Sequence, residues 1–168
     1  MKIIDVTKLS NSYTVRKLTL NDAETIYSFC KKNTQYYEYC GKKLSFELIE
    51  QDLEITPPGI PSEQKFYIGF FENNILTAIM DLVIGYPDEK YSYIGFFMMD
   101  IAQQGRGVGS NIISEAAAYL RSQGFEKCQL GIDKYNPQSN HFWRKNGFEI
   151  IREVPLDEGI ILVAEKTL

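Results

Sequence analysis

Three stretches in the middle of the chain are rich in apolar and aromatic residues and are separated by turn residues. They cover residues 65–72, 75–84 and 91–99. Asn73 and Asn74, between the first two stretches, tolerate positive φ and predict a tight hairpin turn. Strands joined by such short turns pair with their neighbours. The pattern therefore predicts an antiparallel meander of three strands.

The segment before the meander predicts one strand and two helices. The strand covers residues 13–18. Asn21 and Glu24 have the spacing of a capping box, which predicts a helix that runs to about Lys32. Residues 45–54 carry apolar side chains on one helical face and predict the second helix.

After the meander the apolar positions change to helical spacing. From Val108 to Leu120 they recur every three or four residues, and Gly124 follows as the expected C′ residue. Asn136 and Pro137 are typical of an N-cap and first helical position. The expected elements are a helix from 108, a strand over 128–132, a helix from 137 to about 146, and a hairpin over 149–154 and 160–166.

These elements predict an α+β fold. We expect a mixed, mostly antiparallel central sheet with one strand–helix–strand crossover and flanking helices. A chain of 168 residues fits one domain with a core of ordinary size, and no repeat or linker divides it. We therefore expect a single domain over 1–168.

Composition narrows the function classes. The net charge of −4 argues against a nucleic-acid partner. The most apolar stretch, 75–84, is interrupted by Asp81 and is too short to span a bilayer, so no membrane partner is expected. Three cysteines without metal-like spacing and one histidine predict no metal site. Reduced thiols, and a first segment (1–9) without a signal-peptide pattern, predict a cytoplasmic protein.

A glycine-rich loop, Gln104-Gly105-Arg106-Gly107-Val108-Gly109, joins the last meander strand to the following helix. A helix N-terminus carries unpaired N–H groups and partial positive charge, which favour phosphate. Glycines let a diphosphate approach the backbone, and Arg106 and Ser110 could add donors. The structural alternative for the loop by itself is a plain turn before a core helix. Neither a Walker A loop nor a dinucleotide-binding fingerprint fits its sequence and context.

At this point the sequence resembles the GNAT superfamily of N-acetyltransferases. The loop 104–109 fits the family's Arg/Gln-x-x-Gly-x-Gly/Ala motif, and residues 136–148 resemble its Asn…Ala…aromatic…Gly-Phe segment. The meander and closing hairpin match the family's strand order. The resemblance spans about residues 13–166 and implies acetyl-CoA (coenzyme A) as the acyl donor.

The resemblance also implies where the donor lies. Acetyl-CoA would occupy a V-shaped gap between the strand that ends at Met99 and the strand that ends near Ile132. A main-chain N–H near Met99 would face the thioester oxygen and stabilise the charge that develops there. The implied cofactor residues are Phe97, Met98, Met99, Gln104, Gly105, Arg106, Gly107, Val108, Gly109, Ser110, Asn136, Ser139 and Trp143.

One position departs from the family pattern and bears on catalysis. Trp143 stands where many members have a tyrosine that is thought to protonate the leaving thiolate, and an indole has no titratable proton near neutral pH. The general base is open between Asp81, Asp100, Glu38 and a water relay. Asp81 leads because it lies within an apolar strand, although for each carboxylate a structural role remains the alternative. The implied catalytic residues are thus Met99, Asp81 and Trp143.

The acceptor is expected to be a small-molecule or peptide primary amine. Aromatic and acidic residues suit a cation, so the expected acceptor residues are Tyr36, Tyr37, Glu38, Tyr39 and Asp81. Direct attack in a ternary complex is the leading hypothesis. A catalytically inactive acyl-CoA-binding or regulatory domain and a phosphate-binding structural module are the alternatives. A homodimer is left open.

Overall fold

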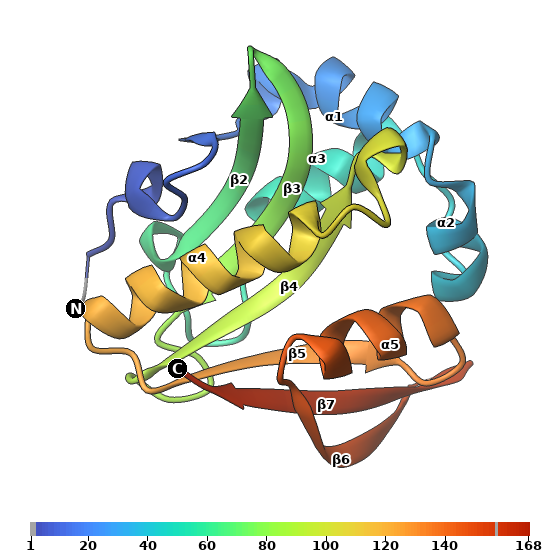
Figure 1. Cartoon of the computed structure of the whole chain (residues 1–168). Coiled ribbons are helices and arrows are strands. Elements are labelled where there is room, and N and C mark those ends of the chain that lie inside the picture. Colours follow the sequence, from blue (N-terminus) through green and yellow to red (C-terminus); the bar gives the residue numbers. More distant parts are fainter. Residues whose placement is uncertain (1–2, 157) are drawn as a thin grey trace.

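A computed structural model describes residues 3–156 and 158–168. Met1 and Lys2, part of the segment considered for a signal peptide, lie outside the described residues, as does Asp157. A seven-stranded sheet of order β1-β2-β3-β4-β5-β7-β6 forms the centre of the molecule (Figure 1). The strands are β1 Thr14–Lys17, β2 Lys65–Glu72, β3 Ile75–Ile84, β4 Tyr91–Met99, β5 Lys127–Asp133, β6 Glu149–Leu156 and β7 Gly159–Thr167.

Neighbouring strands are antiparallel except β4 and β5, which are parallel. The connection between them is α4, as expected for a strand–helix–strand crossover. The α-helices are α1 Ala23–Lys31, α2 Thr34–Cys40, α3 Phe46–Glu54, α4 Val108–Ser122 and α5 Pro137–Lys145. Short 3-10 helices cover Val6–Lys8, Leu20–Asp22, Ser62–Gln64 and Ile101–Gln103. The predicted mixed, mostly antiparallel sheet is confirmed.

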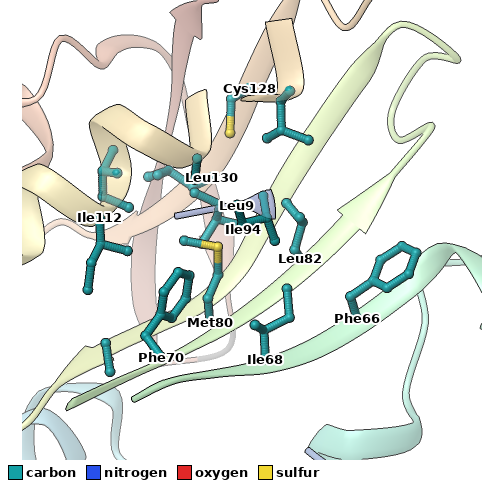
Figure 2. Packing of buried hydrophobic residues seen from close by; sticks show 14 of the residues in the cluster. Leu9, Phe66, Ile68, Phe70, Met80, Leu82, Ile94, Ile112, Cys128 and Leu130 are labelled. Atoms are coloured by element: carbon teal, nitrogen blue, oxygen red, sulfur yellow. The ribbon is translucent and has the colours of Figure 1, made fainter. Parts of the chain in front are cut away.

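Helices cover both faces of the sheet (Figure 1). Along β3 the side chains alternate between two cores, as a strand buried on both faces requires. Met80 and Leu82 belong to the cluster under α4, whereas Ile79 packs with α1 and α3 on the opposite face. Figure 2 shows Met80 and Leu82 with Ile112 of α4 and Leu130 of β5 in the first cluster. The two faces thus give two separate environments along the same strands.

Turn and cap predictions are mostly confirmed. Asn73 and Asn74 have φ of 49° and 64° in the β2–β3 turn. Gly124, with φ of 81°, follows the C-cap residue Gln123 of α4. Asn136 accepts a hydrogen bond from the N–H of Ser139 and caps α5.

Two local predictions in the first fifty residues were wrong or incomplete. The capping box is formed by Thr19 and Asp22 around a 3-10 turn, instead of by Asn21 and Glu24. The segment with Tyr36, Tyr37 and Tyr39, for which no element was predicted, forms the short helix α2, whose C-cap is Gly41 with φ of 68°. No residue of α2 is fully buried, so there was no apolar stripe to predict it.

The sheet opens between β4 and β5. Their parallel pairing extends only from Tyr91 with Lys127 to Ile94 with Leu130, although both strands continue beyond. Leu82 of β3 pairs with Ile94 and Asp81 pairs with Phe96, so Gly95 is the extra residue of a β-bulge. The bulge, which the sequence did not predict, lies where the two strands separate, and this separation is the gap that the resemblance implied.

Candidate active site

The edge of β4 beyond the bulge presents main-chain groups to the gap. The N–H of Asp100, directly after β4, donates to the carbonyl of Thr77 at 2.8 Å. Because main-chain groups alternate in direction along a strand, those of Phe97 and Met99 face away from β3 and toward the gap. By the same alternation the main-chain groups of Met98 face β3, while its side chain lies in the core under α1.

The glycine loop leaves an uncapped helix N-terminus beside this edge. Gly105 and Gly107 have φ of 74° and 77°, a backbone conformation that residues with a side chain rarely adopt. A Cβ at either position would meet no atom within 4 Å. Gly107 is the N-cap of α4, and no side chain of the described residues forms a cap hydrogen bond there. The N–H of Asn111 donates to the carbonyl of Gly107, so the N–H groups of residues 108–110 precede this bond. Open space before free donors fits a phosphate group.

The third glycine of the loop has a different physical role. A Cβ at Gly109 would lie 3.1 Å from the ring of Phe142 and 3.3 Å from the Cγ of Met99. Gly109 is therefore the point at which the first turn of α4 approaches both β4 and α5. Val108 and Ser110, its neighbours, are partly buried.

Four aromatic rings connect the β4 edge to α5. Phe97 stacks on Phe142 with ring centroids 5.8 Å apart and also meets Trp143 at 5.8 Å. Trp143 makes edge contacts with Phe142 at 4.9 Å and Phe148 at 5.1 Å. Trp143 as a residue is 7% exposed. Trp143 thus packs beside the gap, with Asn136 and Ser139 earlier on the same helix.

Asp81 lies on the opposite face of the sheet. Its Oδ2 is 2.8 Å from the Nζ of Lys65, and its buried Oδ1 has no hydrogen-bond partner among the described residues. Burial raises the pKa of Asp81; Lys65 opposes this rise, and Asp52 adds to it. A Cβ at the bulge residue Gly95 would lie 2.8 Å from Oδ2, so the carboxylate is immediately beside the bulge.

Two aromatic residues, Tyr67 of β2 and Phe96 of β4, are the register partners of Asp81 in the sheet. Phe96, the register partner of Asp81, stacks with Tyr67 at 6.4 Å and meets the edge of Tyr36 at 5.3 Å. Tyr36 in turn contacts Tyr37 at 5.1 Å. Of the expected acceptor residues on α2, Tyr36 thus contacts Phe96, the register partner of Asp81.

Other expected residues lie elsewhere. Glu38 and Tyr37 line a cavity of about 480 Å³ between α1, α2 and the following loop, and Asp81 does not line it. Tyr39 is half-buried on α2. The carboxylate of Asp100 accepts from the N–H of Ala102 and caps the 3-10 turn, which is the structural alternative for this residue.

Two further site residues were missed by sequence reasoning. Lys65 is buried beside Asp81, and Asn33 is buried with its Nδ2 3.3 Å from the carbonyl oxygen of Met99. Gln104 reaches the same pair, since its Nε2 donates to Oδ1 of Asn33 at 2.9 Å. In residues 3–156 and 158–168 no cluster of three metal-ligating side chains occurs, and no helix is long and apolar enough to cross a bilayer.

A comparison of the sequence with protein families identifies the arrangement. The sequence model of the Acetyltransferase (GNAT) family matches residues 26–148, which include the glycine loop and the segment from Asn136 to Phe148. The chain belongs to the Acetyltransferase (GNAT) family. No curated protein matches the sequence as a relative.

Solved GNAT structures share the fold at low identity. An acetyltransferase from Thermus thermophilus superposes with a TM-score of 0.75 at 19% identity, covering 100% of both chains. The Salmonella typhimurium acetyl transferase that modifies the N-terminal serine of ribosomal protein L7/L12 gives 0.74 at 17%, covering 95% of this chain and 97% of that one. The PaiA N-acetyltransferase from Thermoplasma acidophilum, in complex with coenzyme A, gives 0.67 at 18%, covering 94% and 99%.

Proposed function

We propose that this GNAT protein transfers an acetyl group from acetyl-CoA to a primary amine by direct attack in a ternary complex. The observation that carries the proposal is the open main-chain edge of Phe97 and Met99 beside the uncapped N-terminus of α4. An extended amide-containing ligand can pair with the first, and a diphosphate can bind the second. A structural relative holding coenzyme A supports this choice of ligand.

The chain offers donors in the order that acetyl-CoA requires. Main-chain N–H groups of the glycine loop would bind the pyrophosphate, with Arg106 and Ser110 adding side-chain donors. Phe97 would bond the pantetheine arm through its main-chain groups, and the N–H of Met99 would lie at the thioester end. Asn136, Ser139 and Trp143 would bound the same ligand from α5. When bound, acetyl-CoA supplies the thioester that the amine attacks.

On the other face, Asp81 is the proposed general base. Its Oδ2 is held by Lys65, which leaves Oδ1 to accept the proton from an incoming ammonium. The raised pKa makes this carboxylate a stronger base than an exposed aspartate. The N–H of Met99 would donate to the carbonyl oxygen on which charge develops. Trp143 bounds the site and supplies no proton, because indole does not titrate near neutral pH.

The proposed acceptor is a cationic amine on a small molecule or a peptide. Tyr67 and Phe96 flank Asp81 in the sheet, and Tyr36 contacts Phe96; together with the carboxylate these rings would attract such a cation through cation–π and charge contacts. The relative that modifies the N-terminal serine of L7/L12 supports a protein N-terminus as one such acceptor. An inactive acyl-CoA-binding domain is the second candidate, and the buried indole of Trp143 in place of a tyrosine is the observation in its favour.

Thermal stabilisation by ligands tests the donor. At 100 times Kd, acetyl-CoA should add about 2.7 kcal/mol to the free energy of unfolding, whereas ATP should add much less. Gly107→Glu should abolish the shift, because the side chain would enter the open space before the helix N-terminus. Gly59→Glu is the matched control, since Gly59 also has positive φ and open space but lies in another loop.

Release of coenzyme A separates the two candidates. The acetyltransferase should release coenzyme A when a panel of amines and peptides is added to the acetyl-CoA complex. Stabilisation by acetyl-CoA without release for any amine would favour the inactive binding domain. Absence of stabilisation by any acyl-CoA at millimolar concentration would remove both.

A further inference from the structure

The side chain of Asn33 does not cap the helix that it precedes. Asn33 is the N-cap residue of α2, where an asparagine side chain ordinarily accepts a hydrogen bond from the first turn of its own helix. No such bond is made. The side chain instead turns inward, where the residue is 7% exposed, and its Nδ2 donates to the carbonyl oxygen of Met99 at 3.3 Å.

The same side chain is joined to the glycine loop. Gln104, the first residue of the loop motif, donates from Nε2 to Oδ1 of Asn33 at 2.9 Å and approaches the carbonyl of Met99 at 3.5 Å. Its Oε1 accepts from Nε2 of Gln138 on α5 at 3.3 Å. A chain of side-chain amides therefore runs from the start of α2 through the glycine loop to α5.

This chain of amides holds the end of β4 at Met99, whose main-chain groups belong to the proposed donor site. Met99 is the last residue of β4, and its main-chain groups face the gap, where no strand among the described residues pairs with them. Asn33 and Gln104 bond its carbonyl oxygen, and the N–H of Asp100 in the same peptide unit bonds the carbonyl of Thr77 on β3, so the end of β4 is held from two sides. Both polar atoms of the Asn33 side chain are bonded, so removing either bond leaves a buried polar group unsatisfied.

Asn33 also bonds the first turn of the helix that carries Tyr36. The N–H of Tyr36 donates to the main-chain carbonyl of Asn33 at 3.2 Å, so the first turn of α2 starts from the same residue. Tyr36 contacts Phe96 beside Asp81. Asn33 is therefore bonded both to the glycine loop, through Gln104, and to the helix whose Tyr36 contacts Phe96.

We propose that Asn33 is a positioning residue that fixes the open edge of β4 against the glycine loop, and so sets the binding geometry for the acyl donor. The inference rests on the proposed function, because the edge and the loop are the proposed donor site. It goes further by assigning a role to a residue outside the loop motif and outside α5.

Asn33→Asp is the decisive variant. Aspartate caps a helix as well as asparagine does, so a capping role would survive the change. The carboxylate has no N–H for the carbonyl of Met99 and places an oxygen against it. We expect Kd for acetyl-CoA, measured by calorimetry, to rise about tenfold, the effect of losing one hydrogen bond of ordinary net strength. KM for the acceptor amine should change less than Kd for the donor.

Gln104→Glu provides a second route to the same contact. The change removes the Nε2 donor to Asn33 from the partly exposed loop side and should also weaken acetyl-CoA binding about tenfold. It serves as the test if Asn33→Asp folds poorly. Ser45→Ala is the matched control, because Ser45 caps α3 through a bond to the N–H of Leu48. It should lower the melting temperature without altering Kd.

The outcomes separate the inference from the proposed function. Unchanged Kd in both Asn33→Asp and Gln104→Glu, with acetyl-CoA binding intact in the wild type, would overturn the role of Asn33 alone. A lower melting temperature with unchanged Kd would mean that Asn33 only stabilises the fold. Failure of the wild type to bind acetyl-CoA would overturn the proposed function and the inference with it.

Discussion

The Nζ of Lys65 lies 2.8 Å from the Oδ2 of Asp81, in a pair whose side chains are 3% and 13% exposed. Lys65 lies on β2 and Asp81 on β3, and their side chains are on the face covered by α1 and α3. Only one oxygen of the carboxylate is engaged, since Oδ1 has no hydrogen-bond partner among the described residues. The pair is therefore a buried ion pair with one acceptor left for a further donor, which is how a site for an ammonium group would be built.

Removing the lysine should be much worse than removing both charges. Lys65→Met leaves the carboxylate of Asp81 buried without its counter-charge, and loss of one partner of such a pair costs about 3–5 kcal/mol. The double variant Lys65→Met/Asp81→Leu should recover most of that loss. Urea unfolding of the three proteins at pH 7 measures the difference. Equal stability of the single and double variants would show that the pair is solvated.

Asp81 should make the fold less stable as the pH rises. Its pKa in the folded protein is raised above the ordinary value of 3.8, so the folded state holds the proton more tightly than the unfolded state does. The resulting stabilisation is present at low pH and is lost as the pH rises through the folded pKa. Asp81→Asn should remove this component. Unfolding free energies measured from about pH 3.5 to 7 should therefore fall less steeply in the variant than in the wild type.

Asp81→Asn should also reduce catalysis if the carboxylate is the general base. Loss of a general base typically costs about 10²–10⁴-fold in rate. The remaining activity should lose the acidic limb that Asp81 gives to the pH profile of kcat/KM. Binding of acetyl-CoA should be unchanged, because Asp81 lies on the other face of the sheet from α4. A wild-type rate in the variant would assign the proton to water.

Trp143→Phe should retain most activity. Neither side chain has a proton to give near neutral pH, and a thiolate with a solution pKa of about 8.5 leaves without a general acid. Phenylalanine keeps an aromatic ring against Phe97 and Phe148. A drop of about 100-fold or more in kcat would instead require the indole N–H. Trp143→Ala should destabilise the fold by about 3–5 kcal/mol, the usual cost of removing a large buried aromatic side chain.

Two roles of Asn136, helix capping and binding of acetyl-CoA, can be separated by mutation. Its Oδ1 accepts from the N–H of Ser139 at 3.0 Å. Asn136→Asp keeps this acceptor and should keep stability, whereas Asn136→Ala should cost about 1 kcal/mol. If the Nδ2 donates to the donor ligand, Asn136→Asp should still weaken acetyl-CoA binding. Thermal melts with and without ligand distinguish the two roles.

Sequence reasoning predicted most elements of the fold because their signals are local. Apolar stretches separated by turn residues identified the meander, helical spacing identified α4, and Asn136 with Pro137 identified the start of α5. Capping boxes are degenerate by comparison: Asn21 with Glu24 and Thr19 with Asp22 have the same spacing, and the 3-10 turn selects the second. Helix α2 was missed because it buries no residue fully.

Only the site residues that belong to a sequence motif could be predicted. The resemblance located the glycine loop, the opening between β4 and β5 and the α5 segment. Asn33 and Lys65 have no such motif, because their partners Met99 and Asp81 are 66 and 16 residues away in the chain. Likewise, the motif does not say that Gly105 and Gly107 are needed for positive φ whereas Gly109 is needed for close packing. Those reasons depend on contacts that only the folded chain makes.

Because β4 and β5 separate beyond Ile94 and Leu130, the sheet has unpaired strand edges in its interior, in addition to the outer edges at β1 and β6. Unpaired strand edges are templates for an added strand, and proteins ordinarily cover or close them. Here the inner edge lies between two strands of one sheet, so an extended small molecule suits it better than a strand of another protein. We therefore expect the amide hydrogens of Phe97 and Met99 to exchange rapidly with solvent in the free protein, unlike those of β3. Ligand should slow their exchange, as though one more strand had joined the sheet.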